Sequence, residues 1–311
     1  MNTKLHGVCV ILATPFDAER RIDEKSLRSL VNFEIQAGVH GITILGVLGE
    51  VLRLSDEERR EVTRIVIEEV RHRVPVVSGT GATGTDLAVK YSREAEDLGA
   101  DALMIAPPRL SKQNDDALVK YYGDVAREVN IPIVVQDEPV TYPVYMSPKL
   151  IARFGEIEGI EYLKLEDPPT PMKISQIRTL MGDRLGIFGG MGGMYTFEEL
   201  SRGAVGVMTG FAYPEVLVAI CEAYSKGKRD AARDLFYRAL PLIRYEAQPS
   251  ISVAIRKELF KRRGVISQTT MREPATQLDS ASLSELEEIT LKVEIATLVE
   301  QSKELITSSH L

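Results

Sequence analysis

The sequence has few of the residues that mark several common classes of protein. Its 311 residues include only two cysteines, Cys9 and Cys221, and each stands in an apolar stretch. This favours two reduced, buried thiols in a cytoplasmic protein, although a disulfide stays possible. The four histidines are scattered without ligand spacing, so we predict no metal site. Apolar runs are no longer than a strand, which argues against a signal peptide or membrane span.

Negative charge also outnumbers positive charge, with 45 Asp and Glu against 38 Lys and Arg. The net charge of -7 argues against a nucleic-acid partner, because phosphate binding requires a basic face. It leaves a small anionic substrate open, since a few local donors are enough to hold one carboxylate.

Short apolar runs recur at nearly regular intervals, and most are rich in valine and isoleucine, as buried parallel strands are. Eight are present: Val8–Leu12, Gly41–Leu45, Val74–Val77, Ala102–Ala106, Ile131–Val135, Ile160–Leu165, Leu185–Phe188 and Ala204–Met208. Helical patterns alternate with them at Ser26–Ala37, Ser55–Arg71, Asp86–Leu98 and Asp115–Val129. Ser55 and Glu58 have the spacing of a capping box, and Gly38 and Gly99 stand where helices end.

Eight strand–helix units predict an α/β fold, a closed (β/α)₈ TIM barrel, with a doubly wound open sheet as the alternative. The length suits one barrel of about 250 residues plus extra helices. The later helical patterns are Tyr213–Ser225, Asp230–Arg244, Ser250–Arg263 and Ser282–Ile306. We therefore predict a barrel over residues 1–225 and a C-terminal helical extension, residues 226–311, packed on it.

Candidate catalytic groups are sought at the carboxyl ends of the strands, where barrel enzymes place their sites. Lys164 stands between Leu163 and Leu165 in the sixth strand. Desolvation there disfavours the ammonium form and yields an amine able to attack a carbonyl. The alternative is a lysine at the strand end whose tip reaches water.

Glu166 follows two residues later, on the same side of the strand as Lys164. A carboxylate near the amine can move protons, and a plain salt bridge is the equal alternative.

Other strand ends offer binding groups. Gly46 permits a tight turn and close approach to a ligand, and the N–H groups of Val47 and Leu48 can hold a carboxylate. Gln136 ends the fifth strand and can hydrogen-bond a substrate. The glycine clusters around Gly190 and near Met208 either leave room for a substrate or are plain turns.

In combination, these motifs resemble the dihydrodipicolinate synthase/N-acetylneuraminate lyase family over about residues 7–264. The marks are Gly46-Val47-Leu48-Gly49-Glu50 for its GxxGE motif, Lys164 for its Schiff-base lysine, and Gly206-Val207-Met208. The resemblance implies a barrel, a lysine imine with pyruvate or a related 2-keto acid, no metal or other cofactor, and a homotetramer.

Several positions depart from the family pattern. Gln136 replaces the tyrosine at the end of the fifth strand, and Val47 and Leu48 replace a pair of threonines. Pro107-Pro108-Arg109 lacks another tyrosine, and the synthase's substrate-binding arginine falls on or near Thr141. The synthase's hydroxyl proton relay is therefore absent, which argues against tetrahydrodipicolinate synthesis.

The branch that contains L-2-keto-3-deoxyarabonate dehydratase fits better. Its likeness lies in Gln136-Asp137-x-Pro139, Lys164-x-Glu166 and Met208-Thr209-Gly210, although the second-strand loop differs. It implies imine formation and loss of water, with Glu166 as acid and base. Two alternatives stay open: an aldolase that cleaves a similar sugar acid to pyruvate and an aldehyde, and a catalytically silent barrel that binds keto acids.

Overall fold

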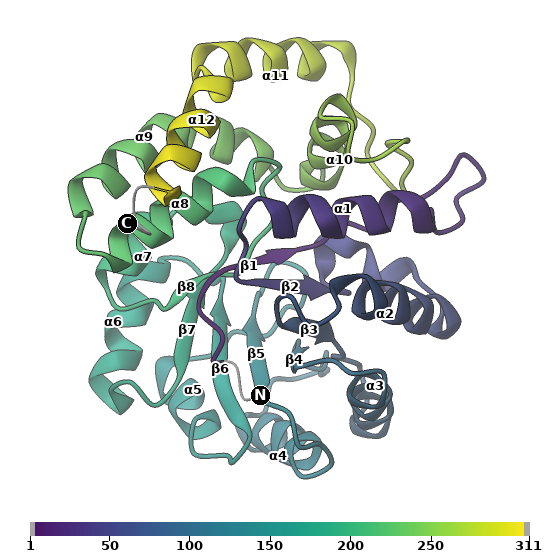
Figure 1. Ribbon diagram of the computed structural model, residues 1–311. Coiled ribbons are helices and arrows are strands. Elements are labelled where there is room, and N and C mark those ends of the chain that lie inside the picture. The colour runs from purple at the N-terminus through teal and green to yellow at the C-terminus, as the bar shows by residue number, and fades with distance from the viewer. Residues whose placement is uncertain (1–3, 308–311) are drawn as a thin grey trace.

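Eight parallel strands close into a ring in the computed structural model, which describes residues 4–307 (Figure 1). The strands are β1 Gly7–Ile11, β2 Gly41–Ile44, β3 Val76–Gly79, β4 Ala102–Ile105, β5 Ile133–Asp137, β6 Ile160–Leu165, β7 Gly186–Gly189 and β8 Gly206–Val207. Each strand pairs with its sequence neighbours, and β8 returns to β1. The predicted closed barrel is confirmed, and the open-sheet alternative is wrong.

Helices surround the ring, as Figure 1 shows. They are α1 Glu24–Gln36, α2 Asp56–Val70, α3 Thr85–Asp97, α4 Asp115–Ala126, α5 Pro148–Phe154, α6 Thr170–Met181, α7 Thr196–Ser201 and α8 Pro214–Ser225. The capping box is confirmed at α2, where Ser55 and Glu58 bond each other's backbone N–H groups. Gly38 and Gly99 have positive φ angles of 88° and 100° directly after the caps of α1 and α3, as expected of glycines that end helices.

The middle of the ring is filled by apolar side chains that alternate with outward-facing ones along each strand. This interior cluster consists of Leu5, Cys9, Ile11, Val77, Ala102, Met104, Val134, Tyr162, Phe188 and Met208, all buried. Because the ring is packed and not open, chemistry has to take place at the strand ends.

Strand boundaries differ from prediction by two residues at both ends of β3 and of β5. The predicted strand, Ile131–Val135, starts and ends two residues too early. Pro132 has no N–H to give to the ladder, and the first such bond here is donated by Ile133 to the Gly159 carbonyl. Gln136 and Asp137 therefore lie in the strand, which fixes the direction of their side chains.

The C-terminal helices gather on one side of the barrel, around α8 and α1 (Figure 1). They are α9 Arg229–Glu246, α10 Ser252–Arg262, α11 Ser280–Lys292 and α12 Ile295–Thr307. The stretch predicted as one helix, Ser282–Ile306, is two, because Glu294 has a left-handed φ of 51°. The boundary between residues 225 and 226 stays a prediction, and residues 1–3 and 308–311, with His310, lie outside the described residues.

Membrane spans need a long apolar helix, and no helix between residues 4 and 307 has both the length and the apolarity for one.

Glu50 ties the C-terminal segment to the loop after β2. The Lys257 ammonium lies 2.6 Å from Glu50 Oε1, and the Arg272 N–H donates to Oε2 at 2.9 Å. Both side chains of the Glu50–Lys257 pair are completely buried or nearly so. Burial lowers the pKa of Lys257, and Glu50 opposes that effect. The pair therefore fixes the GxxGE loop from outside the barrel.

Replacing Lys257 with methionine is expected to destabilise the protein by about 3–5 kcal/mol, because it leaves a buried carboxylate without its cation. Lys261→Met is the matched control, since Lys261 is exposed on the same helix. Urea unfolding measures both variants. If the two show the same free energy of unfolding, the Glu50–Lys257 pair contributes nothing to stability.

Candidate active site

Lys164 is placed by the alternation of β6. Leu163 and Leu165 point outward into the cluster beneath the helices, whereas Tyr162 belongs to the interior cluster. Lys164 has the same parity as Tyr162, so it rises from the top of the packed interior. Its register partner on β5 is Gln136. The structure thus brings these two predicted site residues together at the mouth of the barrel.

Glu166 is in direct contact with the lysine. Lys164 Nζ lies 2.7 Å from Glu166 Oε2, and the two side chains are 6% and 12% exposed. The carboxylate also accepts hydrogen bonds from Gln136 Nε2 at 3.2 Å and from the Met191 N–H at 3.1 Å. An ammonium cannot attack a carbonyl, so the amine has to lose a proton first. Glu166 lies within hydrogen-bond distance to accept that proton.

Gly190 makes room for this carboxylate. A Cβ atom at position 190 would lie 2.3 Å from Glu166 Cγ, which is closer than real atoms approach. The residues after it form a short 3₁₀ turn, Met191–Gly193, that presents the Met191 N–H to Glu166. Gly190 therefore has a steric role beside Glu166, more specific than the plain turn that the sequence also allowed.

The loop after β2 forms a second side of the mouth. Gly46 packs against Ile11, where a Cβ would lie 2.9 Å from Ile11 Cγ2. A 3₁₀ turn, Val47–Gly49, follows, and the N–H groups of Val47 and Leu48 begin it without acceptors inside the turn. The Leu48 side chain packs on the interior cluster, which also contains Met208. All the predicted binding residues are thus at or next to the strand ends.

A second set of ionisable groups lies behind the strands. Asp137 alternates with Gln136 and points outward. There the Lys173 ammonium of α6 lies 2.6 Å from Asp137 Oδ2 and 2.8 Å from Asp167 Oδ2. Burial raises the pKa of Asp137 to about 6, and Lys173 opposes the rise. Burial also raises the pKa of Glu199 to about 8, although Thr170 donates to it at 2.5 Å. These pairs hold the segment after β6 in place.

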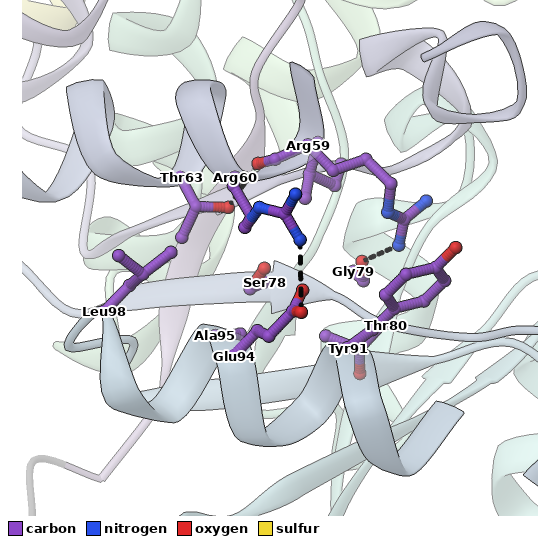
Figure 2. A pocket seen from close by; sticks show the side chains of 11 residues that line it. Arg59, Arg60, Thr63, Ser78, Gly79, Thr80, Tyr91, Glu94, Ala95 and Leu98 are labelled. Carbon is purple, nitrogen blue, oxygen red and sulfur yellow. Dashed lines mark hydrogen bonds and ion pairs between the residues drawn. The ribbon is translucent and has the colours of Figure 1, made fainter. Parts of the chain in front are cut away.

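The structure contains a small cavity away from these groups. It measures about 20 Å³ and lies between α2, α3 and the end of β3 (Figure 2). Figure 2 shows Arg59 reaching the Gly79 carbonyl and Arg60 paired with Glu94 at its edge. This space suits about one water molecule. Lys164 and Glu166 do not line it, so it is separate from the strand-end site.

Sequence reasoning missed Glu138 and Tyr142, which follow β5. Burial raises the pKa of both, that of Tyr142 to about 12, and the Glu166 charge adds to each rise. A signal was present, because Glu138 directly follows Gln136 and Asp137 at the end of the fifth strand. It was passed over because only Gln136 was taken from this motif as a site residue.

Comparison with known proteins agrees with this geometry. A family model described as the dihydrodipicolinate synthetase family matches residues 4–293. A 4-hydroxy-tetrahydrodipicolinate synthase of Syntrophobacter fumaroxidans is 35% identical over 250 residues, which cover 78% of this chain and 84% of that protein. An L-2-keto-3-deoxyarabonate dehydratase of Azospirillum brasilense is 31% identical over 284 residues, covering 90% and 92%.

Solved structures agree as well. The dihydrodipicolinate synthase of Rhodopseudomonas palustris superposes with a TM-score of 0.87 at 32% identity, covering 93% of this chain and 97% of that chain. The family match, the sequence relatives and the barrel therefore agree on the same family. The chain belongs to the dihydrodipicolinate synthetase family and is an enzyme, a lyase.

Proposed function

We propose that this lyase removes water from a 2-keto-3-deoxy sugar acid through an imine on Lys164. The observation that carries the proposal is the 2.7-Å contact between Lys164 Nζ and Glu166 Oε2. The amide of Gln136 stands where the family has a tyrosine, so Glu166 is the proton-transfer group in direct contact with the amine. The Azospirillum brasilense dehydratase supports the same choice, since it is similar over 90% of this chain.

The reaction begins when the Lys164 amine adds to the C2 carbonyl and water leaves, which forms an iminium. The iminium acidifies the C3 proton, and the Glu166 carboxylate removes it to give an enamine. The enamine electrons expel the C4 hydroxyl, which departs as water after gaining a proton. Hydrolysis of the imine then restores Lys164.

The remaining predicted residues bind substrate in this proposal. The N–H groups of Val47 and Leu48 face no acceptor within their turn and suit the substrate carboxylate. Gly46 and Gly190 leave space near it, Gln136 hydrogen-bonds a substrate hydroxyl, and Met208 provides the apolar floor. No metal or added cofactor takes part.

A screen of 2-keto-3-deoxy acids with product identification by mass spectrometry tests the function. A product that keeps the whole carbon chain and has lost water supports the dehydratase. Release of pyruvate and an aldehyde would instead make the protein an aldolase. Binding without turnover would make it a silent keto-acid-binding barrel.

We further propose a cytoplasmic homotetramer. The cytoplasm is supported by Cys9 and Cys221, which are both free and buried, and the tetramer by family membership. Light scattering at micromolar concentration is expected to give four times the mass of the 34.5-kDa chain. A monomer mass would contradict the proposal.

A further inference from the structure

A second carboxyl group stands beside Glu166 at the barrel mouth. Gln136 of β5 is the register partner of Lys164, and the Glu166 N–H donates to the Asp137 carbonyl at 2.8 Å. The register ends at the pair Asp137 and Leu165, and Glu138 and Glu166 are the next residues along the two segments. The charges of Glu166 and Lys164 both act on the Glu138 carboxyl group, which places it near them. Two carboxyl groups thus follow the ends of neighbouring strands, near Lys164.

Glu138 is held in place by its own loop. Its Oε2 accepts a hydrogen bond from the Thr141 N–H at 3.0 Å, and its side chain is partly buried. The backbone and the side chain of Thr141 both act on this carboxyl group, so its hydrogen bonds come from one residue of the same loop. Glu166, in contrast, is engaged by Lys164, Gln136 and the Met191 N–H.

The surroundings of Glu138 favour its protonated form. Burial raises its pKa first of all, the Thr141 hydrogen bond opposes the rise, the Glu166 carboxylate adds to it and the Lys164 ammonium lowers it. Tyr142, on the same loop, is the other titratable group that faces it. When two carboxyl groups are adjacent, the state in which one is protonated and the other ionised is favoured over the state in which both are ionised.

Elimination of a hydroxyl group needs both a base and an acid. The base removes the C3 proton, and the acid protonates the C4 oxygen, since hydroxide is a poor leaving group. Glu166, in contact with the amine, is suited to the C3 proton. C4 is one bond farther from the imine than C3. The acid therefore has to lie beside Glu166, farther from the imine nitrogen of Lys164.

We propose that Glu138 is the general acid that protonates the departing C4 hydroxyl. The inference rests on the proposed dehydratase function. The enamine electrons form the C3–C4 double bond, the C4–O bond breaks with its electron pair on oxygen, and that oxygen takes the Glu138 proton and leaves as water. Glu166 then holds the proton from C3 and Glu138 is ionised. Passage of that proton from Glu166 to Glu138 restores the pair for another cycle.

Glu138→Gln tests the proposal with two substrates and one exchange reaction. With the sugar acid that wild type dehydrates, the variant is expected to lose at least ~10²-fold in kcat, the usual scale of general acid catalysis. With the 4-fluoro analogue it is expected to keep most of its rate, because fluoride leaves without a proton. It is also expected to exchange the methyl protons of pyruvate for deuterium, a reaction that needs only Lys164 and Glu166.

Glu156→Gln is the matched control, because Glu156 is exposed after α5 and the chemical change is the same. It is expected to retain wild-type dehydration. Wild-type activity is expected to fall as the pH rises through the pKa of Glu138, since the acid then loses its proton, and Glu138→Gln lacks this limb.

Equal loss by Glu138→Gln on the hydroxy and fluoro substrates, or loss of pyruvate exchange, would overturn the role by making Glu138 a support for the site. Near-normal dehydration by the variant would also overturn it. A wild-type enzyme that eliminates neither water nor fluoride would instead refute the proposed function.

Discussion

Lys164→Ala is expected to abolish turnover and to prevent the adduct that borohydride traps with pyruvate. The reaction proceeds through a covalent bond to the amine of Lys164. The two other buried lysines among residues 4–307 are both held by carboxylates, Lys173 by Asp137 and Asp167 and Lys257 by Glu50. The fold is expected to survive the change, because Glu166 keeps its hydrogen bonds from Gln136 and Met191.

Peptide mass spectrometry after reduction locates the adduct. Wild type is expected to carry it on the peptide that contains Lys164. Lys173→Met serves as the control, since it also removes a buried, carboxylate-bound lysine. That variant is expected to lose stability but still form the adduct at Lys164. A wild-type adduct on another residue, or none, would refute the imine mechanism.

Much of the fold was predictable because local patterns agree with the global arrangement. The alternation of apolar runs and amphipathic helices requires a sheet covered by helices, and eight repeats of one unit suit a closed ring. The capping box at Ser55 and Glu58 and the glycines at 38 and 99 are also local signals. The pairing of Lys164 with Glu166 followed from strand alternation alone.

Other features depend on contacts between distant segments. The Glu50–Lys257 pair joins residues 207 positions apart, and neither sequence neighbourhood indicates the other. The break at Glu294 is a backbone conformation inside an otherwise helical pattern. Glu138 was missed for a different reason, since the motif Gln136-Asp137-x-Pro139 left its position unassigned. Its nearness to Lys164 and Glu166 depends on how the chain continues after β5, which is a property of the fold.

Glu166→Gln is expected to lose at least ~10²-fold in turnover, the usual scale for general acid–base catalysis. The amide has the shape of the carboxylate and keeps a place between Gln136 and the Met191 N–H, but it cannot accept the C3 proton. Imine formation does not require that step. The variant is therefore expected to form the borohydride-trapped adduct, although more slowly, because the amine has lost its nearest proton acceptor.

The roles of Glu166 and Glu138 can be told apart by the reactions that each variant retains. Glu166→Gln is expected to lose pyruvate methyl exchange and fluoride elimination along with dehydration, since all three begin with the C3 proton. Glu138→Gln is expected to lose only the dehydration of the hydroxy substrate. Deuterium exchange followed by NMR distinguishes them directly. If Glu166→Gln exchanges and dehydrates at a rate near wild type, Glu166 is a structural partner of Lys164, and the salt bridge is its whole role.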